Sequence, residues 1–297
     1  METICNEELR VTVSPVGAEI QQATDVRTGT EYMWQGDARY WSGRSPILFP
    51  AVGGLWNATC RVGGKAYPLP KHGFVRLREW DVLERRPDSV TFGLSGTEAD
   101  LAAFPWPYAL RVRYTLRGRS VEAAFEVDNP GTEEMFFQMG GHPGIALPDF
   151  SEDEPVSGFL KLEGELRGVL RAGEQGCTGP ERFPVPLTAD GLVPLSVETF
   201  ANEALIFDGG QIKAATVLGT DRRPLARVES TAPVWLFWSP QGVHSPFVCA
   251  EPWYGLCDPI GFEGDVSQRP FINRLAPGQT WRGGFVLTLC QGSSTRG

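Results

Sequence analysis

The chain has 297 residues, 41% of them hydrophobic, and can bury a large core; large all-β domains reach this length, so we expect one domain over residues 1–297. A net charge of −9 argues against a nucleic-acid partner, because binding a phosphate backbone requires clustered Lys and Arg. The N-terminus lacks the basic start and apolar run of a secretory signal, and no apolar stretch is long enough to span a bilayer. We therefore expect a cytoplasmic protein without membrane contact.

The cysteine pattern favours reduced thiols over a disulfide framework or a zinc site. No two of the six cysteines form a Cys-x-x-Cys pair. They are Cys5, Cys60, Cys177, Cys249, Cys257 and Cys290. Walker loops, dinucleotide fingerprints, nucleophile elbows and His-x-x-x-His ligand pairs are also missing. The sequence therefore predicts neither a metal nor a cofactor.

Short Val-, Phe-, Leu- and Trp-rich runs between evenly spread Gly and Pro indicate many β-strands. The one helical turn we expect covers residues 98–104, after Thr97 as N-cap and before Pro105. The clearest hairpin joins residues 109–116 to residues 121–127, since both arms alternate apolar with polar side chains.

Further along the chain, residues 128–132 form a strong turn signal. The apolar runs that follow predict strands buried on both faces, at residues 135–139, 234–238 and 247–250. Without a repeat or a linker, these elements predict one large antiparallel all-β sandwich.

The most informative segment is residues 249–255, where Glu251 is followed by Pro252 and Trp253. Counting back by twos along a strand places Cys249 on the same face as Glu251, an apolar setting that would raise the pKa of the carboxyl group. Such a group suits proton transfer at neutral pH. The alternative is a surface or ion-paired glutamate that ends a strand.

Two of the three histidines stand in distinctive contexts. His142 follows two glycines, which permit close approach of a ligand or strand, and is fixed by Pro143. His72 lies in a rigid loop after a proline-rich approach. His244 occupies a polar turn, and we assign it no role. A structural role is the alternative for both His142 and His72.

Arg44 interrupts an aromatic and apolar passage, residues 41–50. Its guanidinium is a fixed fork of donors suited to hydroxyl oxygens or carboxylates, and packing against an acid is the alternative.

The order of these segments resembles the aldose 1-epimerase (galactose mutarotase-like) family, and its LacX-like branch most closely. Five short motifs, spread over most of the chain, carry the resemblance. They are residues 44–50 with 52–53, residues 69–76 with Trp80, residues 140–143, residues 251–255 and residues 275–280.

The resemblance implies a β-supersandwich and a reaction that interconverts the α and β anomers of a free aldose without metal or cofactor. By motif, Glu251 corresponds to the general base and His142 to the general acid. Arg44 and His72 fall on positions similar to the family's sugar-binding residues, and Trp253 offers an apolar face to the sugar.

The sequence departs from galactose mutarotases proper after His72, where Gly73 to Arg76 replace a Gly-rich continuation. Asp208 is the best candidate for the family's additional sugar-binding acid, although Asp-Gly-Gly is also an ordinary turn. Galactose specificity does not follow from the motifs.

Two alternatives stay open. One is a mutarotase for hexose 6-phosphates, to which Lys71, Arg76 and Arg78 would contribute positive charge. The other is a carbohydrate-binding protein that keeps the fold without turnover. In each case the partner is a small-molecule sugar, and the assembly is a monomer or a homodimer.

Overall fold

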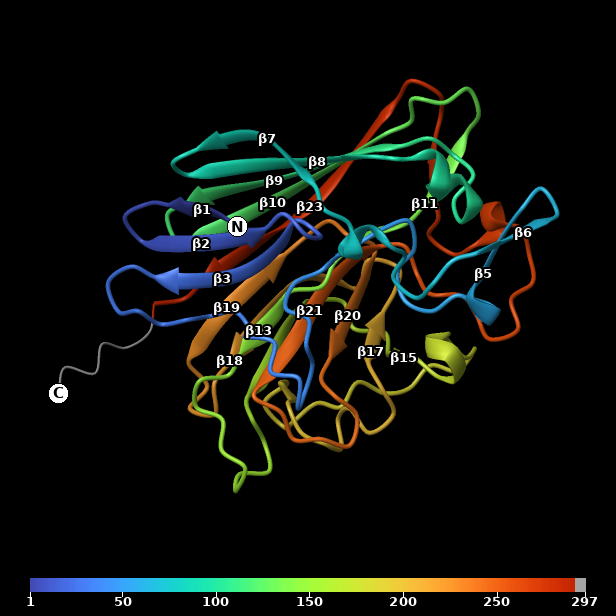
Figure 1. Ribbon diagram of the computed structural model, residues 1–297. Helices are drawn as coiled ribbons and strands as arrows, with labels where there is room; N and C mark the ends of the chain where they lie inside the picture. Colours follow the sequence, from blue (N-terminus) through green and yellow to red (C-terminus); the bar gives the residue numbers. More distant parts are fainter. Residues whose placement is uncertain (292–297) are drawn as a thin grey trace.

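The computed structural model describes residues 1–291, and residues 292–297 of the predicted domain lie outside the described residues. The regular secondary structure of the described residues is almost entirely antiparallel β-sheet, arranged in layers (Figure 1). Within residues 1–291, the helical segments are five short 3-10 turns: η1 (Trp56–Ala58), η2 (Val75–Leu77), η3 (Glu98–Ala102), η4 (Glu174–Gly176) and η5 (Val266–Gln268). None of the helices in this range has the length and apolar character needed to cross a bilayer.

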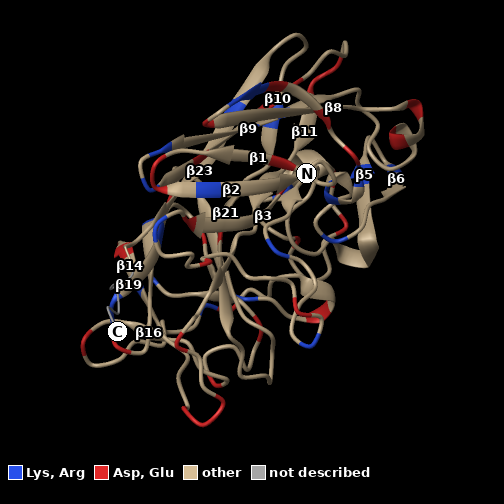
Figure 2. Ribbon diagram, turned by 60° about the vertical axis from the view of Figure 1, so that its left-hand side comes forward, with Lys and Arg blue, Asp and Glu red and all other residues tan. Residues whose placement is uncertain are grey.

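The larger sheet has nine strands in the order β16-β14-β18-β19-β23-β10-β9-β8-β7. Their bounds are β7 (Asp81–Arg86), β8 (Ser89–Ser95), β9 (Ala109–Arg117), β10 (Ser120–Asp128), β14 (Phe159–Gly164), β16 (Val193–Pro194), β18 (Ile212–Leu218), β19 (Pro224–Glu229) and β23 (Thr280–Leu289). Basic and acidic residues lie side by side on this layer (Figure 2), as where Glu126 bridges Arg111 and Arg282 at 2.7 and 2.9 Å. Its outer face is therefore polar.

The second sheet has seven strands in the order β15-β17-β20-β21-β12-β4, with β13 also paired to β21. Their bounds are β4 (Ile47–Leu48), β12 (Met139–Gly141), β13 (Gly144–Ala146), β15 (Leu170–Arg171), β17 (Leu205–Phe207), β20 (Val234–Trp238) and β21 (Phe247–Tyr254). Smaller sheets comprise β1 (Glu2–Cys5), β2 (Leu9–Ser14) and β3 (Glu19–Asp25), then β5 (Thr59–Val62) with β6 (Lys65–Pro68), and β11 (Met135–Phe137) with β22 (Asn273–Leu275).

The main core lies on one face of the seven-stranded sheet, and strand alternation decides which side chains enter it. In β20, Trp235 and Phe237 join this core, whereas Val234 and Leu236 belong to a second apolar cluster on the other face. Burial on both faces explains why this strand reads as a continuous apolar run.

The predicted hairpin is confirmed as β9 and β10, which pair Arg117 with Ser120 around a turn of two residues. Gly118 adopts a φ of 56°, a conformation that glycine tolerates readily. Buried and partly exposed residues alternate along both strands, as the sequence pattern predicted.

Two local expectations need correction. The helical turn η3 forms where predicted, with the Asp100 carboxylate accepting from the Thr97 N–H at 2.8 Å, but it is one of five such turns rather than the only one. Residues 135–139 are not one strand, because β11 ends at Phe137 and β12 begins at Met139. Gln138 breaks the run: its side-chain amide accepts from the Val52 N–H and donates to the Leu256 carbonyl.

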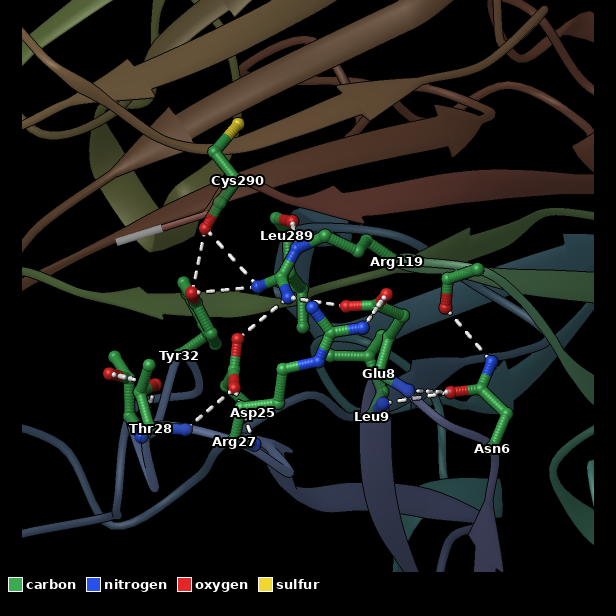
Figure 3. A network of polar contacts seen from close by, with 12 residues as sticks. Asn6, Glu8, Leu9, Asp25, Arg27, Thr28, Tyr32, Arg119, Leu289 and Cys290 are labelled. Carbon is green, nitrogen blue, oxygen red and sulfur yellow. Dashed lines mark hydrogen bonds and ion pairs between the residues drawn. The ribbon is translucent and has the colours of Figure 1, made fainter. Parts of the chain in front are cut away.

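A polar clamp ties the N-terminal sheet to the end of β23 (Figure 3). Arg119, in the turn between β9 and β10, contacts the Asp25 carboxylate at 2.6 Å and donates to the Leu289 carbonyl at 2.8 Å. It also donates to the Tyr32 hydroxyl, which donates in turn to the Cys290 carbonyl at 2.6 Å. Burial opposes ionisation of Asp25, but hydrogen bonds from Thr28, Arg119 and Arg27 outweigh it, and the pKa of the carboxyl is lowered.

We expect Asp25→Asn to lower the free energy of unfolding by about 1–3 kcal/mol, because it removes the nearer of the two carboxylates paired with Arg119, at 2.6 Å against 3.3 Å for Glu8, while keeping a turn acceptor. Chemical denaturation at neutral pH measures this loss. The difference between variant and wild type should shrink as the pH falls through the lowered pKa of Asp25, since the contribution requires the ionised form. Glu84→Ala, which removes an exposed ion pair with Arg86, is the matched control and should cost less than about 1 kcal/mol. Equal losses in the two variants would contradict the clamp.

Candidate active site

A pocket of about 290 Å³ lies on the face of the seven-stranded sheet that points away from the main core. Apolar side chains of three strands line it: Leu48, Ile206 and Leu236. Glu251 and Trp253 reach it from β21, because Val248 and Ala250 of the same strand face the main core. The alternation inferred from the sequence for this segment therefore holds.

The pairing of β21 with β12 and β13 places His142 opposite Glu251. Gly140 pairs with Trp253 and Gly144 pairs with Cys249, so that the same register continues across the gap between the two short strands. His142 Nε2 lies 3.2 Å from Glu251 Oε2.

Gly140, two residues before His142, is required by close packing. A Cβ atom at Gly140 would lie 2.8 Å from Trp253 Cδ1, closer than real side chains allow. The space left at Gly140 lets the Trp253 indole lie beside the carboxylate, to which its Nε1–H donates at 3.1 Å. The ring of His142 is fixed separately by stacking on Trp41, with centroids 4.8 Å apart.

Both members of the pair are buried, with 0% of Glu251 and 7% of His142 exposed. Within the described chain, Glu251 Oε1 and His142 Nδ1 have no hydrogen-bond partner. Burial raises the pKa of Glu251 well above its ordinary value, although nearby Lys71 and the Trp253 donor oppose this. Burial likewise lowers the pKa of His142 to about 3. Glu251 and His142 are therefore joined by a hydrogen bond between groups without net charge, and not by a solvated ion pair.

His72 lines the same pocket, and its tautomer follows from its contacts. Its Nδ1 accepts from the Gly53 N–H at 3.1 Å, which assigns the ring proton to Nε2. Burial lowers the pKa of His72 well below its ordinary value, so the ring is neutral and offers one N–H donor. Gly73 lets the backbone that follows His72 pass close to Phe49, because a Cβ at Gly73 would lie 2.0 Å from the Phe49 carbonyl oxygen.

Two residues predicted to bind substrate do not line this pocket. The Arg44 guanidinium donates to the Gln21 carbonyl at 3.0 Å, so it is directed toward the neighbouring strand β3. The Asp208 carboxylate pairs with Arg182 at 2.8 Å, as a structural acid would. The segment 205–208 nevertheless supplies Ile206 to the pocket.

Several residues that line the pocket were not predicted from the sequence. Trp238 follows Val234 and Leu236 on one face of β20, and counting by twos along that strand would have indicated it. Lys71 and Arg76, which the sequence suggested only for a phosphorylated substrate, also line the pocket. Trp41 lies in the aromatic passage around Arg44, but no local signal distinguishes the residue that enters the pocket from its neighbours.

The fold and pocket define a protein of the galactose mutarotase-like class, as comparison with solved structures confirms. A galactose mutarotase related enzyme from Lactobacillus acidophilus superposes with a TM-score of 0.88 at 29% identity, covering 99% of this chain and 98% of that one. A galactose mutarotase-like protein from Lactobacillus casei gives a TM-score of 0.91 at 26% identity, covering 98% and 100%. Protein LacX of Lactococcus lactis is 28% identical over 302 residues, covering 96% of this chain and 97% of the relative. The family profile described as Aldose 1-epimerase matches residues 2–288, and the chain belongs to that family.

We expect Trp253→Phe to raise the pKa of Glu251 further, because the variant keeps an aromatic ring and loses the N–H donor that favours the carboxylate. The carboxyl ¹³C shift of Glu251, followed by NMR against pH, measures this. Trp235→Phe is the control, since Trp235 lies on the opposite face of the sheet and its Nε1 has no partner within residues 1–291. An unchanged titration in Trp253→Phe would contradict the assigned hydrogen bond.

Proposed function

We propose that the protein is an aldose mutarotase, which interconverts the α and β anomers of an unphosphorylated hexose or similar free sugar. The observation that carries the proposal is the convergence of Glu251 and His142, 3.2 Å apart, in one pocket of sugar size. Membership of the aldose 1-epimerase family supports the reaction class.

In this reaction Glu251 takes the proton from the anomeric hydroxyl, and His142 gives a proton to the ring oxygen. The bond between C1 and the ring oxygen breaks, and the sugar opens to an aldehyde. Rotation about the C1–C2 bond presents the other face of the carbonyl to the hydroxyl that closes the ring. On closure the two side chains exchange their proton-transfer roles, so that the enzyme returns to its starting state.

The electrostatics of the pair fit a single shared proton. Burial raises the pKa of Glu251 and lowers that of His142, which favours a protonated carboxyl beside a neutral imidazole. Passage of this proton to His142 Nε2 along the hydrogen bond puts base and acid into their working forms at once. Ring opening then returns a proton to Glu251 and removes one from His142, so the pair keeps one proton overall.

Neighbouring residues would hold the sugar. Trp41, Trp238 and Trp253 line the pocket and offer apolar faces to the C–H surface of the ring. His72 supplies one N–H donor to the hydroxyl groups. Because Arg44 and Asp208 are engaged elsewhere, Lys71 and Arg76 take their place as charged groups beside the substrate.

Glu251→Gln should lower the enzyme-dependent rate of anomer exchange at least about 100-fold, because the amide cannot accept the anomeric proton. Polarimetry of a freshly dissolved aldose measures the rate. The variant should unfold at the same or a higher temperature than the wild type, since an amide is buried at less cost than a carboxyl group.

Asp208→Asn is the carboxylate control and should keep most of the wild-type rate, because Asp208 lies outside the pocket lining. An unchanged rate in folded Glu251→Gln would rule out the base assignment. Binding of aldoses by the wild type without any exchange would instead identify a carbohydrate-binding protein.

A second function, mutarotation of hexose 6-phosphates, is favoured by one observation. Lys71 and Arg76 line the pocket and form no ion pair in the part of the chain that the structure describes, and Arg76 Nε is buried there without a hydrogen-bond partner. Two unpaired cations would suit a phosphate group. Arg78 does not contribute, because it pairs with Asp100 at 2.6 Å.

A panel of glucose, galactose and xylose with the hexose 6-phosphates separates these functions. For the phosphorylated class, Lys71→Met should raise KM for the 6-phosphate about tenfold or more and leave free sugars less affected. Arg78→Met is the control and should not change the preference. A free sugar preferred by wild type and equally affected by Lys71→Met would exclude the phosphorylated substrate.

A further inference from the structure

The pocket pair has a third polar neighbour that the proposed reaction does not use. Cys249 lies two residues before Glu251 on β21, and its thiol faces the same side of the sheet. The ligand atoms of His142, Cys249 and Glu251 all lie within 4.8 Å of one another. Gly144 pairs with Cys249 in the register that places His142 opposite Glu251, so the arrangement follows from the backbone pairing.

The spacing of these atoms is close to that of a tetrahedral metal site. Bonds of about 2.0–2.1 Å from zinc to nitrogen and oxygen, at the tetrahedral angle, put those two ligand atoms about 3.3 Å apart. The observed distance from His142 Nε2 to Glu251 Oε2 is 3.2 Å. With a zinc–sulfur bond of about 2.3 Å, the thiol must approach by little more than about 1 Å, which a change of side-chain rotamer supplies.

A second observation points to a ligand at the same place. Glu251 is 0% exposed, yet its Oε1 atom has no hydrogen-bond partner within residues 1–291. No hydrogen bond to Cys249 Sγ is found in that range either. A buried carboxylate oxygen without a partner costs free energy, and a bound cation would recover it.

We propose that His142, Cys249 and Glu251 form a binding site for a soft divalent cation of the zinc class, and that the bound ion inhibits the reaction in the pocket. The ion would take one nitrogen, one sulfur and one oxygen ligand from the chain, and its fourth position would face the cavity. Binding releases two protons to solvent, the Cys249 thiol proton and the proton shared by Glu251 and His142, because the ligands are the thiolate, the carboxylate and the neutral imidazole. Mg²⁺ and Ca²⁺ are disfavoured, since they require several oxygen ligands.

Inhibition follows from the ligand set and rests on the proposed function. The ion occupies the atoms of His142 and Glu251 that would exchange protons with the sugar, and its fourth ligand occupies space needed by the anomeric centre. The bound ion therefore opposes catalysis. Binding of the ion does not itself depend on any assumed reaction.

Titration of the reduced full-length protein with Co²⁺ tests the binding, because a cobalt–thiolate bond gives a charge-transfer absorption in the near ultraviolet. The wild type should show this band with visible transitions of a four-coordinate ion. Cys249→Ala should lose the band and weaken binding about tenfold or more. Cys60→Ala is the control, a buried cysteine remote from the cluster, and should keep the band.

A Co²⁺ spectrum without the sulfur band in the wild type, or a band that survives Cys249→Ala, would overturn the site. Zn²⁺ should displace Co²⁺ and abolish the band, whereas excess Mg²⁺ should not.

Zn²⁺ should also slow anomer exchange by the wild type and have about tenfold less effect on Cys249→Ala at the same concentration. Equal inhibition of the two proteins would contradict the inhibitory role. A wild type without exchange on any sugar would remove the proposed function, while the Co²⁺ spectra still decide whether the ion binds.

Discussion

Strand β21 has to bury a carboxyl group on one face while it packs Val248 and Ala250 into the main core with the other. This requirement fixes much of what surrounds it. His142, the partner of Glu251, must lie directly opposite it on the neighbouring segment of the same sheet. Gly140 must leave room for the Trp253 indole, which donates to the carboxylate. A shift of the register by one residue would turn Glu251 into the core and remove the pocket.

Burial of the carboxyl group and the imidazole costs stability and changes the pKa values of both groups. A desolvated carboxyl beside a desolvated imidazole holds one proton between two groups of altered pKa, which neither group would do in water. Trp41 fixes the His142 imidazole by stacking on it. The proposed reaction needs only these side chains to move a proton over a short distance, and the proposed cation site adds the Cys249 thiol to them.

Alternation within strands was readable from the sequence, and it correctly gave the hairpin of β9 and β10 and the shared face of Cys249 and Glu251. Register between distant strands was not readable, because nothing local indicates that β12 and β13 both pair with β21. For the same reason the sequence marked Arg44 as unusual but could not predict which way its side chain points. Its guanidinium is directed to a strand some twenty residues earlier in the chain.

The order of strands in the nine-stranded sheet has a consequence for how the protein is made. β23 lies between β19 and β10 at the centre of the sheet, although it comes last in chain order among the strands of the described residues. Until it emerges from the ribosome, β10 and β19 present unpaired edges, and the Arg119 clamp lacks its carbonyl acceptors at Leu289 and Cys290. From the completion of β10 until β23 emerges, the nascent chain is therefore open to edge-to-edge association.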